Sequence, residues 1–142
     1  MNTLELIEPE RRALNGEKII RLPYGLLGFE GVKDYMLLIR PHEEPFVWLQ
    51  MLDGARHAFL VVSPFLVLPD YRPDIAEEDA RFLELTSPAD AQLINIVTLR
   101  RSGEATINLK GPIVLNRHTM IGKQVIPNNA AQYSVHHRLP VS

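Results

Sequence analysis

Histidines are the first candidates for chemistry in this chain, because it contains five of them and no cysteine. A zinc site needs three or four ligands that converge on one point. His136 and His137 are adjacent, so in a strand their side chains would point to opposite faces. The other three are His42, His57 and His118. This spacing predicts no metal site.

Three glycines in the run Tyr24-Gly25-Leu26-Leu27-Gly28-Phe29-Glu30-Gly31 could suggest a phosphate-binding loop. Their spacing fits neither the dinucleotide motif nor the P-loop, and no lysine follows where a P-loop would require one. Glycine is also the residue that turns use to reach positive φ. The run therefore predicts a turn-rich corner, and we expect no cofactor.

Nucleophilic and acid–base catalysis find little support. The lack of cysteine excludes thiol chemistry, disulfides and thiolate metal sites. Ser63 precedes Pro64, and no G-x-S-x-G elbow is present. The acid pairs Glu43/Glu44 and Glu77/Glu78 lie in polar stretches, whereas a general acid needs a desolvated pocket that raises its pKa. The residues predict a protein that is not an enzyme and has no catalytic site.

Charge is unevenly distributed along the chain. Residues 1–99 carry sixteen acidic and nine basic side chains, whereas residues 100–142 carry one acidic and six basic side chains. An acidic body suits a basic protein partner, and a basic C-terminal third suits nucleic acid. A third interpretation is that these are solvated faces that cancel on folding. A small β-barrel that binds nucleic acid through Phe46, Trp48 and Tyr133 is the alternative function.

Length and hydropathy set the context for these residues. A chain of 142 residues is expected to form a single domain over 1–142 with a sufficient core. The N-terminus lacks the basic and apolar regions of a secretory signal, and no apolar stretch approaches the ~20 residues that span a bilayer. We expect a soluble cytoplasmic protein without a membrane segment. An isolated monomer is compatible with this sequence.

Short apolar runs separated by turn residues dominate the chain and predict strands. In Phe46–Met51, residues Phe46, Trp48 and Gln50 should point one way and Val47, Leu49 and Met51 the other. In residues 106–110, Ile107 and Leu109 should face the core, and Thr106, Asn108 and Lys110 should face outward. The predicted strands are Leu4–Ile7, Glu17–Leu22, Tyr35–Arg40, Phe46–Met51, His57–Val62, Leu93–Arg100, Ala105–Lys110, Ile113–Asn116, Ile121–Ile126 and Gln132–His136.

Turn and cap signals complete the predicted fold. Asn15-Gly16 and Ser102-Gly103 predict turns between strands. Asp74 with Glu77 predicts a helix that Asp74 caps, and Ser87-Pro88 predicts a second single-turn helix or tight turn. The prolines in Ser63–Pro73 exclude a central strand there. The predicted fold is mainly β, a compact barrel-like structure or sandwich of short antiparallel strands with one or two short helices.

The run from Asn108 to Asn116, followed by Gly122-Lys123-Gln124-Val125, places two strands around a Gly111-Pro112 corner with no catalytic group nearby. With three further blocks it resembles the FliW family of flagellar assembly factors, although alanine is common there in place of Gly111. The further blocks are Leu22–Glu30 with Tyr35, Pro45–Val62, and Pro69-Asp70-Tyr71, and Tyr133 also matches. The blocks follow the family's order and cover nearly the whole chain.

This resemblance implies a compact, mostly β fold and a function without catalysis. FliW proteins bind flagellin in the cytoplasm and also bind CsrA, a dimeric RNA-binding repressor of flagellin translation. FliW that is freed by flagellin secretion captures CsrA and relieves the repression. Outward-facing polar or large residues in the matching blocks are then the predicted partner contacts. These predicted partner-binding residues are Asn108, Lys110, Asn116, Gln124, Phe46 and Trp48.

Overall fold

The computed structural model describes residues 17–54 and 56–140. The predicted strand Leu4–Ile7 and the turn at Asn15-Gly16 lie outside the described residues. The strands are β1 (Glu17–Arg21), β2 (Asp34–Leu38), β3 (Val47–Met51), β4 (Ala58–Val62), β5 (Ala91–Leu99), β6 (Ala105–Ile107), β7 (Ile113–Asn116), β8 (Gly122–Gln124) and β9 (His137–Arg138). The helix α2 (Glu77–Phe82) and four 3₁₀ turns complete the described elements: η1 (Pro41–Glu43), η2 (Pro64–Leu66), η3 (Pro88–Asp90) and η4 (Ala130–Gln132).

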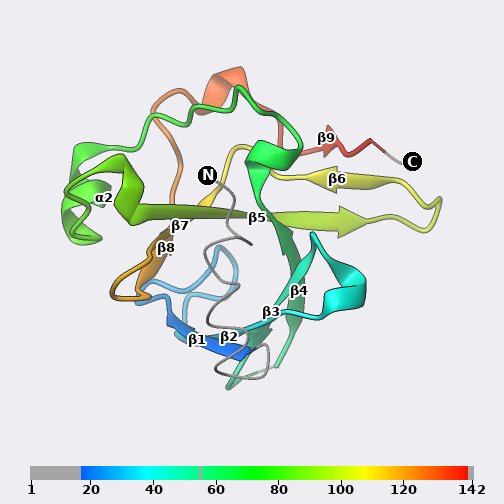
Figure 1. Ribbon diagram of the computed structural model, residues 1–142, viewed down its shortest axis with the longest axis horizontal. Helices are drawn as coiled ribbons and strands as arrows, with labels where there is room; N and C mark the ends of the chain where they lie inside the picture. Colours follow the sequence, from blue (N-terminus) through cyan, green and yellow to red (C-terminus); the bar gives the residue numbers. More distant parts are fainter. Residues whose placement is uncertain (1–16, 55, 141–142) are drawn as a thin grey trace.

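The strands form one antiparallel sheet in the order β1-β2-β3-β4-β5-β6-β9, from which β7 and β8 branch at β5 (Figure 1). A single bridge between Arg21 and Ile121 links β1 to the start of β8. The fold is therefore mainly β and barrel-like, as the sequence predicted, with one short α-helix among the described residues. The sheet is joined by this bridge and not closed by a continuous ladder.

The longest strand, β5, organises the molecule (Figure 1). Its second half pairs with β6 (Val97 with Ile107), and its first half pairs with β7 (Ile94 with Ile113), both antiparallel. Residues 108–112 thus form a corner between two segments that run along the same strand. Because β5 contributes to both segments, residues 92–95 of this strand are buried on both faces, whereas Thr98 and Leu99 at its end are exposed.

Two apolar clusters fill the interior. The first lies inside β1–β4 and includes Leu37, Leu49 and Ile113. The second lies around β5, β6 and the loop after β4, and includes Tyr71, Leu93 and Ile107. Burying apolar surface of this extent is the main force that holds such a fold together.

Alternating burial confirms the predicted faces of β3. Val47, Leu49 and Met51 are buried, whereas Trp48 and Gln50 are half-buried on the opposite face. The turn at Ser102-Gly103 connects β5 and β6 as predicted, with Gly103 at a φ of 88° that suits glycine. The proline-rich stretch after β4 forms η2 and a loop.

Three predictions were wrong in detail. Thr106 is buried and does not face outward, because β6 lies between β5 and β9 and is buried along its whole length. Residues 132–136 do not form a strand; η4 ends at Gln132, and only His137 and Arg138 pair with β6. The helix begins at Glu77 with Ala76 as its N-cap, so Asp74 does not cap it.

Candidate functional site

The corner between β6 and β7 is built by Asn108. Its Oδ1 accepts hydrogen bonds from the backbone N–H of Lys110 at 2.9 Å and of Gly111 at 3.1 Å. This is the local side-chain-to-backbone pattern by which asparagine stabilises turns. The carbonyl of Asn108 in turn accepts a 2.8 Å bond from Nδ2 of Asn95, a buried residue of β5. Asn108, which is itself half-exposed, therefore fixes the shape of the corner.

Gln124 joins this corner to the glycine-rich loop at residues 23–31. Its Nε2 donates to the carbonyl of Gly111 at 3.1 Å, and its Oε1 accepts from the N–H of Leu27 at 2.9 Å. A Cβ on Gly111 would lie 3.1 Å from this Nε2 and 3.2 Å from Nδ2 of Asn108. The structure thus brings Asn108, Gly111 and Gln124 into one cluster, which we call the amide corner.

Asn116 lies at the far end of β7 and is only 3% exposed. Its Nδ2 donates to the carbonyls of Leu83 at 2.8 Å and Glu84 at 3.3 Å. Its Oδ1 accepts from the N–H groups of His118 at 2.8 Å and Thr119 at 3.2 Å. This amide therefore ties the end of α2 to the turn after β7.

The remaining predicted contacts lie apart from one another. Lys110 is half-exposed in the amide corner, and its ammonium has no ion-pair partner within residues 17–54 and 56–140. Trp48 is half-buried on β3, where its Nε1 donates to Glu43 at 3.2 Å. Phe46 packs against the second apolar cluster. In the sheet, β4 and β5 separate these aromatic residues from β7 and β8.

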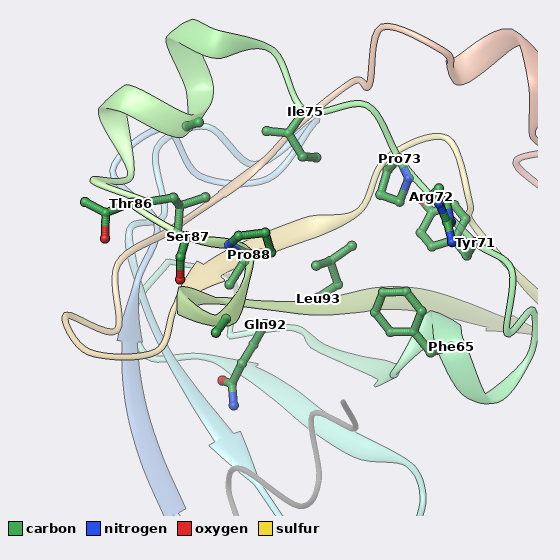
Figure 2. A pocket seen from close by; sticks show the side chains of 14 residues that line it. Phe65, Tyr71, Arg72, Pro73, Ile75, Thr86, Ser87, Pro88, Gln92 and Leu93 are labelled. Atoms are coloured by element: carbon green, nitrogen blue, oxygen red, sulfur yellow. The ribbon is translucent and has the colours of Figure 1, made fainter.

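A groove that was not predicted runs along β5 (Figure 2). Thr86, Ser87 and Pro88 lie at one end, Phe65 and Tyr71 lie at the other, and Ile75 and Leu93 lie between. Its cavity volume is ≈ 870 Å³, within the roughly 300–1,000 Å³ typical of ligand sites. Most of its lining side chains are apolar, so the groove suits apolar groups of a partner.

The helix α2 connects the groove to a second exposed surface. Ala80 lines the groove, whereas Asp79 and Phe82 meet Lys123 of β8. The Lys123 ammonium lies 5.0 Å from the ring centre of Tyr24 and 5.9 Å from that of Phe82, and it pairs with the Asp79 carboxylate. These contacts fix α2 against the glycine-rich loop and β8.

The carboxyl group of Asp90, close to one end of the groove, has a lowered pKa. Hydrogen bonds from the side chain and backbone of Thr86, then from Ser87 and His118, lower the pKa of Asp90 to about 2. The Asp90 carboxylate and Ser87 also form a capping box around η3. Since a carboxylate that is stabilised as an anion cannot act as a general acid near neutral pH, this group serves structure.

In the described part of the chain, no three His, Asp or Glu side chains come together in a way that could hold a metal ion. No helix within residues 17–54 and 56–140 is long and apolar enough to cross a membrane.

Comparison with known proteins decides the family. The FliW family model, described as FliW protein, matches residues 8–139. This chain belongs to the FliW family. A FliW from Treponema denticola is 37% identical over 124 residues, which cover 87% of this chain and 84% of that protein. A FliW from Desulfitobacterium hafniense is 39% identical over 129 residues, covering 89% and 83%. Both relatives are named flagellar assembly factors.

A solved FliW structure supports the same conclusion. The crystal structure of a flagellar assembly factor FliW superposes with a TM-score of 0.78 at 33% sequence identity, covering 87% of each chain. The resemblance noted from the sequence blocks is thus confirmed by sequence and by fold. The groove escaped sequence reasoning because its walls come from separate segments; the apolar Ile75 and Leu85 flanking α2 were the available signal.

Proposed function

We propose that this chain is a cytoplasmic flagellar assembly factor that works by binding proteins and not by catalysis. Its partners are flagellin and the translational regulator CsrA, and it antagonises CsrA so that flagellin mRNA is translated. Membership of the FliW family is the observation that carries this proposal. The exchange between two partners follows from mass action and needs no reactive group in the domain.

The charge of the chain supports a basic partner. Sixteen acidic side chains precede residue 100, so the body of the molecule can steer a basic RNA-binding protein and disfavour RNA close by. A complex formed in this way weakens as salt screens the charges. Salt dependence is therefore part of the proposal.

The partner contacts that we propose are the exposed parts of the predicted residues. Lys110, Asn108 and Gln124 present the half-exposed amide corner, and Phe46 and Trp48 present partly buried aromatic surface on and beside β3. Asn116, although predicted as a contact, is 3% exposed and both ends of its amide already bind the backbone, so we assign it a structural role and no partner contact. Such a surface supplies shape and hydrogen bonds but no chemistry.

The nucleic-acid alternative loses support from the aromatic residues. The Nε1 of Trp48 is bonded to the Glu43 carboxylate, a group that repels phosphate. The ring of Tyr133 packs edge-on against Tyr71 at 4.8 Å, and its hydroxyl accepts a bond from Arg72 N. Single-strand binders instead expose aromatic faces beside basic side chains.

Calorimetric titration of this chain with purified CsrA, and separately with purified flagellin, tests the proposed function. We expect a saturable complex with each partner, and we expect the CsrA complex to weaken between low and high salt. Absence of a complex with both partners would contradict the proposal. A gel shift with structured RNA in the absence of CsrA is the control, and direct salt-sensitive binding there would favour the nucleic-acid alternative.

A further inference from the structure

The groove along β5 is a mostly apolar surface that residues 17–54 and 56–140 leave open. Ile75, Leu85 and Phe65 are only partly buried, and Pro88 and Ala89 are exposed. A concave, mostly apolar site with a volume of ≈ 870 Å³ falls within the range typical of binding pockets. The labelled lining side chains are spread along β5, from Ser87 and Pro88 at one end to Phe65 and Tyr71 at the other, which suits a rod-like group better than a compact one (Figure 2).

The walls of the groove are held in place from behind. Tyr71 donates to the carbonyl of Leu109 at 2.7 Å, which fixes one end of the loop. Asn129 fixes the middle of the loop, because its Nδ2 donates to Arg72 O at 2.9 Å and its Oδ1 accepts from Asp74 N at 2.8 Å. At the other end, Asp90 accepts bonds from Thr86 and Ser87. A pre-formed groove binds with a smaller loss of conformational entropy.

The segment that forms most of the walls is strongly acidic. Residues 70–90 carry seven acidic and two basic side chains. Of the two bases, Arg81 is paired with Glu77 at 2.9 Å, and Arg72 lines the groove. Two further acids are paired as well, Asp79 with Lys123 and Asp90 with His118. The acidic side chains flank the groove and do not line it. Asp70, Asp74, Glu78 and Glu84 are exposed. An occupant with apolar side chains and lysine or arginine flanks is therefore complementary to this surface.

We propose that this groove binds an amphipathic helical segment of a protein partner, with its apolar face in the groove and basic residues against the acidic segment 70–90. The inference rests on the proposed function, in which the chain acts by holding proteins. Helices that dock in this way present apolar residues at i, i+3, i+4 and i+7. The apolar side chains spread along β5 and the excess of acidic side chains in residues 70–90 are the two features that such a helix matches.

A labelled synthetic peptide tests the proposal directly. The probe is a helical peptide of about 16 residues with leucines at positions i, i+3, i+4 and i+7 and lysines elsewhere. One control peptide has the same composition with the leucines scattered around the helix, and another has glutamate in place of lysine. Fluorescence anisotropy with the full chain should give saturable binding of the probe and at least about tenfold weaker binding of both controls.

The protein offers a matched pair of variants. Ala89→Trp places a bulky ring on an exposed groove residue in the middle of η3. Ala131→Trp makes the same change at an exposed residue in the middle of η4, outside the groove lining. We expect Ala89→Trp to weaken probe binding at least about tenfold and Ala131→Trp to leave it unchanged. Equal binding by both variants would overturn the proposal.

A second measurement covers the case in which Ala89→Trp does not fold. Amide chemical-shift changes in the wild-type chain on probe addition should centre on residues 65–93, and changes centred elsewhere would overturn the proposal. The results also distinguish a failure of the groove proposal from a failure of the proposed function. If flagellin or CsrA binds normally but the probe does not, the groove proposal falls alone. If neither protein binds, the proposed function falls.

Discussion

The hydroxyl of Tyr71 donates a 2.7 Å hydrogen bond to the backbone carbonyl of Leu109, 38 residues further along the chain. Leu109 lies within the turn that joins β6 to β7, beside Asn108. This bond therefore connects the groove wall to the amide corner, the two surfaces to which we assign partner binding. Tyr71 is 1% exposed, so water does not replace the bond.

Replacing Tyr71 by phenylalanine should reduce stability while keeping the ring. The carbonyl of Leu109 would lose a partner in a buried position, which typically costs about 1–3 kcal/mol. Urea unfolding of Tyr71→Phe measures this loss. Tyr24→Phe is the control, because the Tyr24 side chain is largely exposed, and it should change the free energy of unfolding little.

Alkaline pH should destabilise the protein through two buried tyrosines. Burial raises the pKa of Tyr71 to about 12, and burial followed by the charge of Asp53 raises the pKa of Tyr35 to about 12. An unfolded tyrosine ionises near pH 10, so the unfolded state gains stability above that pH while the folded state keeps its protons. The stability present below pH 10 is therefore lost as pH rises towards 12.

Thermal melts between pH 8 and 12 measure this effect. The wild-type melting temperature should fall above pH 10, and Tyr35→Phe should show a shallower fall, because the variant has one fewer tyrosine whose folded pKa is raised. An identical alkaline profile for wild type and variant would rule out Tyr35 as a source of the effect.

Adding a methyl group at Gly122 should disrupt the contact between β7 and β8. A Cβ there would lie 2.4 Å from Cδ2 of Leu115 and 2.9 Å from the carbonyl of Val114. Overpacking of this kind costs about 1–3 kcal/mol. Gly31→Ala is the matched control, since a Cβ at Gly31 has nothing within 4 Å. Chemical denaturation should separate the two variants, and equal stability would show that β8 shifts to make room.

Stability and partner binding should separate at Asn116 and Lys110. Asn116→Ala leaves backbone groups at the end of α2 and in the turn after β7 unpaired, so we expect a loss of about 1–3 kcal/mol in unfolding free energy.

Lys110→Ala should leave the melting temperature unchanged but weaken the complex with CsrA or with flagellin at least about fivefold. Calorimetry with CsrA and flagellin checks binding, and a stable Lys110 variant that binds both normally removes Lys110 from the surface.

Local sequence patterns were sufficient for most of the fold. The alternation in β3 and the Ser102-Gly103 turn are set by neighbouring residues, so short-range rules describe them well. Asp74 shows where such rules fail. Its N–H binds Asn129 and its carbonyl accepts from Asn128 N, so partners more than 50 residues away hold the backbone that a helix cap would use. No local pattern contains that information.

The candidate site likewise has features that the sequence predicted and features that it did not. The sequence singled out the segment around Gly111-Pro112, and the structure brings Asn108, Gly111 and Gln124 together there. The sequence did not indicate that the side chain of Gln124 bonds to the backbone of Leu27, 97 residues away, or that Asn116 is buried against the end of α2. Both facts depend on how β7 and β8 fold back onto β5, which is a property of the tertiary structure.

A competition experiment tests most directly whether this chain acts by exchanging protein partners. The chain is first bound to CsrA, the complex is isolated by size-exclusion chromatography, and purified flagellin is then added in excess. We predict that CsrA elutes free and that flagellin takes its place in the complex. If CsrA remains bound while flagellin elutes unbound at every ratio, partner exchange is contradicted.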